Sequence, residues 1–196
     1  MGKSLATRDA DLLLAGLGFL PDPLDWPVFV VVSGLPGTGK SFFSRSLARR
    51  FPVAVLETDL LRRRLVERPT YSAEESQRLF AAVHLLIERL LREGIPLLID
   101  ATNLVERNRE ILYHLAEQTG AKLILIQTRA PREVALRRLR ARGSPFAAED
   151  HSTAGVEVYR RMRLVAEPIR RRHYVVDTSK DISPAVARVV REIRND

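Results

Sequence analysis

The hydrophobic and polar positions of the chain follow two alternating periods. Short apolar runs rich in valine, isoleucine and leucine predict buried strands at 28–32, 53–56, 95–100, 121–128 and 173–177. Longer segments with apolar residues three and four positions apart predict helices at 7–17, 42–50, 72–92, 156–171 and from 183 onward, and two more that end near 120 and 143. Strands and helices that alternate in this way indicate an α/β protein built on an open sheet.

The first 27 residues precede the first predicted strand and form a separate segment. Their helix at 7–17 is followed by Pro21, Pro23 and Pro27, which hold the connection extended. We expect residues 1–27 to be a helical extension laid over the core and residues 28–196 to form the functional domain. The alternative is an arm that regulates the protein or binds a partner.

Composition narrows the class of protein. The chain has 196 residues, of which 45% are hydrophobic, enough for one sizeable core, and no apolar run of about 20 residues is free of charge. The absence of cysteine excludes disulfides, thiolate catalysis and cysteine-based zinc sites. Because the N-terminal residues lack the pattern of a secretory signal, we expect a cytoplasmic protein with no membrane partner and no disulfide partner.

Positive charge dominates the chain, with a formal net charge of +8, and all but four of its 32 basic residues are arginine. Guanidinium groups bind phosphate bidentately, so this bias suits a protein that handles phosphate or touches nucleic acid. Arginine richness set by genome composition or surface preference explains the same bias. Charge alone therefore does not identify the partner.

The segment after the first predicted strand carries the most specific chemistry. It fits the pattern G-x-x-x-x-G-K-[ST] at every fixed position, from Gly34 to Ser41. Glycines let backbone N–H groups converge on phosphate oxygens, the lysine reaches the β- and γ-phosphates, and the serine hydroxyl ligates Mg²⁺. The predicted nucleotide ligands are Gly34, Pro36, Gly37, Thr38, Gly39, Lys40, Ser41 and Phe42. A chance glycine-rich turn would need neither the buried strand before this segment nor the amphipathic helix after it.

The second predicted strand is followed by a carboxylate, at the edge where open α/β sheets place their chemistry. Asp59 can accept the proton of an acceptor hydroxyl, and Arg62, one helical turn on, can bind an acceptor phosphate. The competing interpretation makes Asp59 the N-cap of the next helix and Arg62 part of its solvated face. Spacing alone does not separate the two. Tyr71, in the polar connection that follows, is a candidate contact for the acceptor.

The third predicted strand ends in Asp100, the form of a Walker B element. Asp100 would hold Mg²⁺ directly or through water, together with Ser41. Asn103 and Arg107 come shortly after it and are candidates for acceptor binding. The alternative is that Asp100, Thr102 and Asn103 only cap the following helix. We favour a metal role for Asp100 and leave Asn103 and Arg107 open.

A basic helix follows the fourth predicted strand. Its Arg138 and Arg142 are four positions apart and share one face. A helix of this kind can close over ATP and neutralise the charge that builds up on a transferred phosphoryl group, and we place such a lid at about 131–155. An ordinary solvated helix is the alternative. After the fifth strand, the turn at Thr178 offers backbone groups on which an adenine can rest.

The order of these features resembles P-loop kinases of the polynucleotide 5′-kinase type, within a looser AAA-type group that includes zeta-toxin-like and small-metabolite kinases. The resemblance extends from about 28 to 193 and rests on the phosphate loop, on Asp59 with Arg62, and on the Asp100-Ala-Thr-Asn103 stretch. It implies a three-layer P-loop NTPase fold with a five-stranded parallel sheet in the order 2-3-1-4-5 and an arginine-bearing helical lid.

The resemblance also implies roles for particular residues. Asp59 would be the general base, Arg62 a ligand of the acceptor phosphate, and Arg138 and Arg142 the lid arginines. Together with Lys40 these residues describe an ATP- and Mg²⁺-dependent phosphotransferase whose acceptor is a nucleic-acid 5′-hydroxyl or a small-metabolite hydroxyl. The rival from another class is a nucleotide-binding or ATPase module that has no second substrate.

Overall fold

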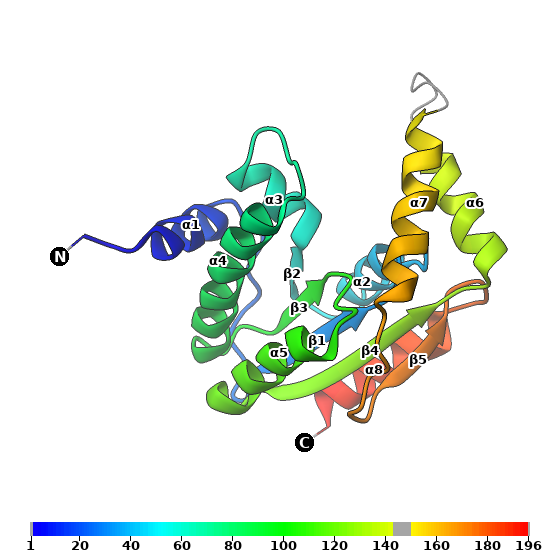
Figure 1. The fold of residues 1–196 in the computed structure, drawn as a ribbon. Coiled ribbons are helices and arrows are strands. Elements are labelled where there is room, and N and C mark those ends of the chain that lie inside the picture. Colours follow the sequence, from blue (N-terminus) through cyan, green and yellow to red (C-terminus); the bar gives the residue numbers. More distant parts are fainter. Residues whose placement is uncertain (1, 143–149, 196) are drawn as a thin grey trace.

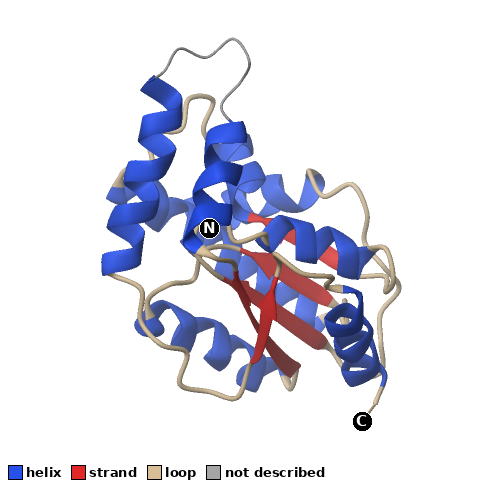
Figure 2. Cartoon of the chain, turned by 90° about the vertical axis from the view of Figure 1, so that its right-hand side faces the viewer, coloured by secondary structure: helices blue, strands red, loops and turns tan. Residues whose placement is uncertain are grey.

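The protein is built on a five-stranded parallel sheet, whose strands are drawn in red between the helices in Figure 2. The computed structural model describes residues 2–142 and 150–195, with side chains described except at 142 and 150–154. The strand order is β2-β3-β1-β4-β5, which confirms the order 2-3-1-4-5. The strands are β1 (Val28–Ser33), β2 (Ala54–Glu57), β3 (Leu97–Asp100), β4 (Lys122–Arg129) and β5 (Tyr174–Asp177).

Helices cover both faces of the sheet and complete the three layers (Figure 1). One face packs against residues of α1, α3, α4 and α5, and the other packs against α2 and α8. α6 and α7 stand together beyond the carboxyl end of β4. The helices are α1 (Leu5–Ala15), α2 (Lys40–Ala48), α3 (Thr58–Leu65), α4 (Ala73–Arg92), α5 (Glu106–Thr119), α6 (Arg132–Arg142), α7 (Asp150–Leu164) and α8 (Ser183–Arg194).

The central strand β1 is buried along its whole length. Phe29 and Val31 point into the core on the α4 side, whereas Val28, Val30 and Val32 point into the core on the α2 side. This alternation follows from the two-residue period of a strand, and burial on both faces explains why the run is continuously apolar. β1 therefore holds the loop that follows it at the centre of the sheet edge.

The N-terminal helix α1 packs against α4 and contributes Leu13, which is fully buried, to the core. Asp9 accepts two hydrogen bonds from the guanidinium of Arg78 on α4, at 2.7 and 2.8 Å. This charge-assisted pair holds the pKa of Asp9 below its usual value. α1 is thus part of the same packed body as the sheet.

Most predicted elements are shifted at their ends by one or two residues, and three predictions about helix ends and caps need a larger correction. The helix expected at 156–171 runs from Asp150 to Leu164; Pro168 disfavours helical geometry in the residue before it, so the helix does not continue to 171. α3 begins at Thr58, with Glu57 at the N-cap position, so the interpretation of Asp59 as the N-cap was wrong. α5 begins at Glu106 after Val105, so Asp100 and Asn103 do not cap it. Among the described residues, no helix combines the length and apolar character needed to cross a membrane.

Candidate functional site

The glycine-rich loop connects β1 directly to the first turn of α2. Gly37 and Gly39 have φ values of 78° and 84°, in the left-handed region that glycine adopts without strain. A Cβ atom at Gly37 would lie 2.5 Å from the carbonyl oxygen of Ala135, so α6 packs closely over the loop. No side chain caps α2, and its first N–H groups therefore remain available to an anion.

Threonine hydroxyls tie this loop to β4 and to the segment that follows β5. The Thr38 hydroxyl donates to the carbonyl oxygen of Leu35 at 2.7 Å and lies 2.9 Å from the hydroxyl of Thr128 on β4. Thr178, after β5, donates its hydroxyl to the carbonyl oxygen of Thr38 at 2.7 Å. Lys40 folds its ammonium back to within 3.3 Å of the Leu35 carbonyl oxygen. The predicted nucleotide ligands from Gly34 to Phe42 thus lie in one loop and the helix start that follows it. The Thr38 side chain fixes the shape of that loop through its hydrogen bonds.

Asp100 lies at the carboxyl end of β3, directly opposite Val32 of β1. Its side chain is buried, and its Oδ2 atom has no hydrogen-bond partner among the described residues. A buried carboxylate oxygen without a partner is rare, and a hard cation such as Mg²⁺ would supply the missing interaction. In the described part of the chain no group of three or more acidic or histidine side chains forms a metal site, so the remaining ligands of a cation at Asp100 would be Ser41, water and a bound nucleotide.

A second carboxylate, which the sequence analysis did not assign a role, lies beside Asp100. Glu57 ends β2 and pairs with Asp100 across the sheet. Burial raises the pKa of the Glu57 carboxyl, and the nearby negative charges of Asp100 and Asp59 add to the rise. Asp59 itself is exposed in the first turn of α3. Glu57 and Asp100 therefore end neighbouring strands, and Asp59 lies in the first turn of the helix after β2. The sequence signal for Glu57 was its place directly after the strand predicted at 53–56.

Arg62 does not present its guanidinium to an open site. The side chain is buried, and Nη1 lies 2.5 Å from Oε1 of Glu75 on α4. Tyr71, which is exposed and has a positive φ of 57°, places its ring 4.7 Å from the Arg62 guanidinium. Glu75 also accepts hydrogen bonds from the backbone N–H groups of Thr70 and Tyr71. Arg62 and Glu75 thus fasten the connection between α3 and α4 to the body of the protein.

The stretch after β3 is held from within the core. Asn103 is buried and donates from Nδ2 to the carbonyl oxygen of Val32 at 3.3 Å. Arg109, only 1% exposed, donates to the carbonyl oxygen of Asn103 at 2.6 Å. Arg107, by contrast, is exposed on the outside of α5. The structure therefore separates the two acceptor candidates of this stretch, because Asn103 supports the loop while Arg107 lies at the surface.

Arg138 and Thr178, predicted for the lid and for the adenine site, are brought into direct contact. Arg138 donates to the Thr178 hydroxyl at 2.8 Å and to its carbonyl oxygen at 2.7 Å, and a weaker bond at 3.4 Å reaches the carbonyl oxygen of Gly37. Arg142 is the last residue of α6, and its side chain lies outside the described residues, as does part of the predicted lid. Phe42 is exposed and lines a small cavity between α2 and the start of α8.

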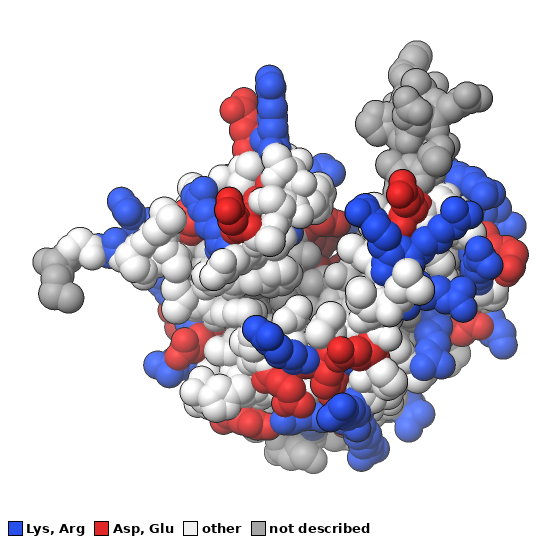
Figure 3. Space-filling view, viewed as in Figure 1, with Lys and Arg blue, Asp and Glu red and all other residues white. Residues whose placement is uncertain are grey.

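A hollow separates the side of the molecule formed by α3 from the side formed by α6 and α7, where basic side chains gather (Figure 3). Asp100 is the last residue of β3, and the loop and Asp59 come after β1 and β2. These three strands are neighbours, and their carboxyl ends meet at this edge. In open α/β sheets ligands bind outside the carboxyl ends of the strands. The arrangement can therefore hold a phosphate chain, a cation and a hydroxyl group close together.

Comparison with known proteins agrees with this geometry. The profile of a family described as "AAA domain" matches residues 29–169. The L-seryl-tRNA(Sec) kinase of Methanococcus maripaludis is 24% identical over 127 residues, which cover 62% of this chain and 49% of that protein. The chain thus spans about half the length of this curated relative.

Two solved structures share the fold. The structure of APE1195 is 21% identical, with a TM-score of 0.71 over 88% of this chain and 98% of that one. Kti12 from Chaetomium thermophilum, solved in complex with ADP-AlF3, is 20% identical, with a TM-score of 0.64 over 85% of this chain and 97% of that one. At this level of identity the likeness concerns the fold alone.

Proposed function

This chain belongs to the AAA domain family, and from that membership and the geometry of the site we propose that it transfers the γ-phosphoryl group of ATP to a hydroxyl acceptor. The observation that carries the proposal is the set of three neighbouring strand ends. They present a phosphate-binding loop, a buried carboxylate with an unpaired oxygen, and an exposed carboxylate. An exposed carboxylate at this edge of the sheet can accept the proton of a hydroxyl acceptor.

The loop and its lysine bind the triphosphate in this mechanism. Backbone N–H groups of Gly37, Gly39, Lys40 and Ser41, together with the Lys40 ammonium, contact the β- and γ-phosphates. Ser41 and Asp100 would hold Mg²⁺, which supplies positive charge to the phosphate oxygens when bound. Arg138 adds a guanidinium beside the loop, where it donates to Thr178, and Thr178 remains the candidate for contact with the base of the nucleotide.

Asp59 is assigned the proton transfer. Its carboxylate accepts the proton of the acceptor hydroxyl as the oxygen forms a bond to the γ-phosphorus and the bond from that phosphorus to the β,γ-bridging oxygen breaks, leaving ADP. Glu57, whose carboxyl pKa is raised by burial and by the charges of Asp100 and Asp59, ends β2 two residues before Asp59. Tyr71 and Arg107 are exposed residues that remain candidates for contacts with the acceptor.

The test is transfer of a labelled γ-phosphate to DNA and RNA 5′-hydroxyl ends, to a seryl ester and to a panel of small alcohols. We expect Asp59→Asn to lower transfer at least about a hundredfold and to leave ATP affinity within about threefold. Asp22→Asn, at an exposed carboxylate in the connection that precedes β1, is the matched control. Unchanged turnover in Asp59→Asn would remove this residue from the mechanism.

The same assay separates the acceptor classes. Binding of a polynucleotide should weaken steeply as salt rises, because phosphate contacts release counterions, whereas a small neutral alcohol should show a flat response. ATP hydrolysis without transfer to any acceptor in the panel would favour the rival ATPase module. The seryl ester is included in the panel because the Methanococcus maripaludis relative is an L-seryl-tRNA(Sec) kinase.

A further inference from the structure

A cavity of about 650 Å³ opens beside the phosphate loop, on the side away from α2. Its walls come from the first loop residues, including Leu35, from the carboxyl end of β4, and from α7 through Tyr159 and Arg163. Tyr159 and Arg163 are four positions apart and so share one helix face. The volume lies within the range of small-molecule sites, and a ligand in the cavity would lie next to the phosphates held by the loop.

The lining of this cavity is rich in positive charge. Arg129, Arg132 and Arg163 all line it, and within the described residues none of them forms an ion pair with a carboxylate. Arg129 donates only to the neutral side chain of Gln127, at 2.9 Å. The acid in the lining is Glu167. Three arginines against one glutamate leave two positive charges in excess.

The other two charged side chains that line the cavity, Arg109 and Glu167, already interact with other parts of the protein. The charge of Arg109 is matched by Glu106, with Nε and Oε2 2.5 Å apart. Glu167 accepts a hydrogen bond from the backbone N–H of Glu106 at 2.7 Å and so caps α5 from a distant part of the chain. The excess of positive charge therefore rests on Arg129, Arg132 and Arg163.

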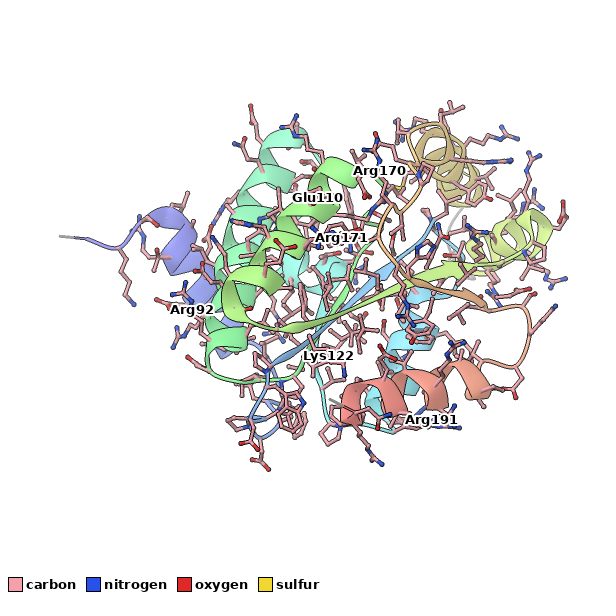
Figure 4. The ribbon with its side chains drawn as sticks, turned by 90° about the horizontal axis from the view of Figure 1, so that it is seen from below. Arg92, Glu110, Lys122, Arg170, Arg171 and Arg191 are labelled. Carbon is pink, nitrogen blue, oxygen red and sulfur yellow. The ribbon has the colours of Figure 1, made fainter. Side chains whose placement is uncertain are left out.

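The wall that carries Arg163 is firmly anchored. Arg109 donates to the carbonyl oxygens of Glu167 and Pro168, at 2.9 and 2.8 Å, just beyond the end of α7. Arg171 extends the same connection along α5, where it pairs with Glu110 (Figure 4) and with Glu117. A wall whose backbone is held by hydrogen bonds before a ligand arrives loses little conformational entropy on binding.

From these observations we propose that the cavity binds a phosphate group carried by the acceptor. Guanidinium groups bind phosphate oxygens bidentately, and the excess of two positive charges matches a phosphate monoester dianion or two successive phosphodiesters. Arg62, which the sequence suggested for this role, is committed to Glu75. The inference rests on the proposed phosphotransferase activity, and it assigns that activity a phosphorylated acceptor.

A binding experiment tests the cavity independently of phosphoryl transfer. Inorganic phosphate is titrated calorimetrically into protein whose loop is saturated with a non-hydrolysable ATP analogue. We expect one phosphate site in the unaltered protein, and a dissociation constant at least tenfold higher in Arg132→Gln/Arg163→Gln. Arg161→Gln, two positions from Arg163 and so on another face of α7, is the control and should bind as the unaltered protein does.

A transfer experiment tests the assignment to the acceptor. It compares one alcohol with and without a phosphate monoester elsewhere in the molecule, and a 5′-hydroxyl oligonucleotide. We expect the KM for the phosphorylated acceptor to be at least tenfold lower than that for the unphosphorylated one. In Arg132→Gln/Arg163→Gln this difference should disappear, while the KM for ATP stays within threefold of that of the unaltered protein. Preference for the monoester or for the oligonucleotide identifies the source of the phosphate.

The two experiments separate the two proposals. Equal use of phosphorylated and unphosphorylated acceptors overturns the cavity assignment, as does a phosphate titration that the double variant leaves unchanged. Hydrolysis of ATP without transfer to any acceptor overturns the phosphotransferase proposal. In that case the phosphate titration still decides whether the cavity binds anions.

Discussion

Arg109 is the buried charge on which the packing of α5 against the end of α7 depends. Its guanidinium donates to Oε2 of Glu106 and to the carbonyl oxygens of Asn103, Glu167 and Pro168, at distances from 2.5 to 2.9 Å. The side chain is 1% exposed, and that of Glu106 is 9% exposed. Arg109→Met would keep the apolar stem of the side chain and remove every one of these hydrogen bonds.

The expected cost follows from what the substitution leaves behind. Glu106 would keep a buried carboxylate without its cation, and three carbonyl oxygens would lose a donor. Breaking a buried ion pair by removing one partner typically costs about 3–5 kcal/mol, and a domain of this kind is stable by about 5–15 kcal/mol. We therefore expect Arg109→Met to lower the free energy of unfolding by about 3–5 kcal/mol.

The measurement is urea unfolding followed by far-UV circular dichroism, with linear extrapolation to water. Arg107→Met, two positions away and exposed, should change the free energy of unfolding by no more than about 0.5 kcal/mol. In a Glu106→Gln background the cost of Arg109→Met should differ by at least about 0.5 kcal/mol, because the two side chains interact directly. A cost under about 1 kcal/mol, or the same cost in both backgrounds, would refute the reasoning.

Two further predictions concern the loop and its neighbourhood. Gly37→Ala should weaken ATP binding at least tenfold in a fluorescent-nucleotide titration, because the new Cβ would lie 2.5 Å from the Ala135 carbonyl oxygen. The control is Gly18→Ala, where an added Cβ would have no atom within 4 Å, and it should bind ATP as the unaltered protein does. The pKa of Glu75 is lowered from 4.5 to about 2, chiefly by the hydrogen bond that its carboxylate accepts from the Thr70 backbone N–H. The contribution of Glu75 to stability is therefore complete above pH 4.5 and is lost as pH falls toward 2. Glu75→Gln should make urea midpoints less dependent on pH across that window, and an unaltered dependence would contradict this assignment.

Local chemistry in the sequence determined much of the fold and the centre of the site. The glycine-rich loop could be recognised because phosphate binding needs fixed residue types at fixed spacing, and β1 because a strand buried on both faces is continuously apolar. Asp100 was identified from its place at the end of an apolar run, and the structure adds that one of its oxygens is buried without a partner. The strand order came from the resemblance that these motifs carry, and the observed sheet confirms it.

Tertiary structure alone decided how the arginines are used. Arg62 looked available in sequence, but its partner Glu75 lies 13 positions away on another helix. Arg109 contacts backbone 58 and 59 positions further along the chain, and the arginine-lined cavity joins residues from β4, α6 and α7. A guanidinium carries the same charge whether it is paired, buried or open to a ligand. Only the three-dimensional arrangement of its neighbours distinguishes these states, and no local pattern records that arrangement.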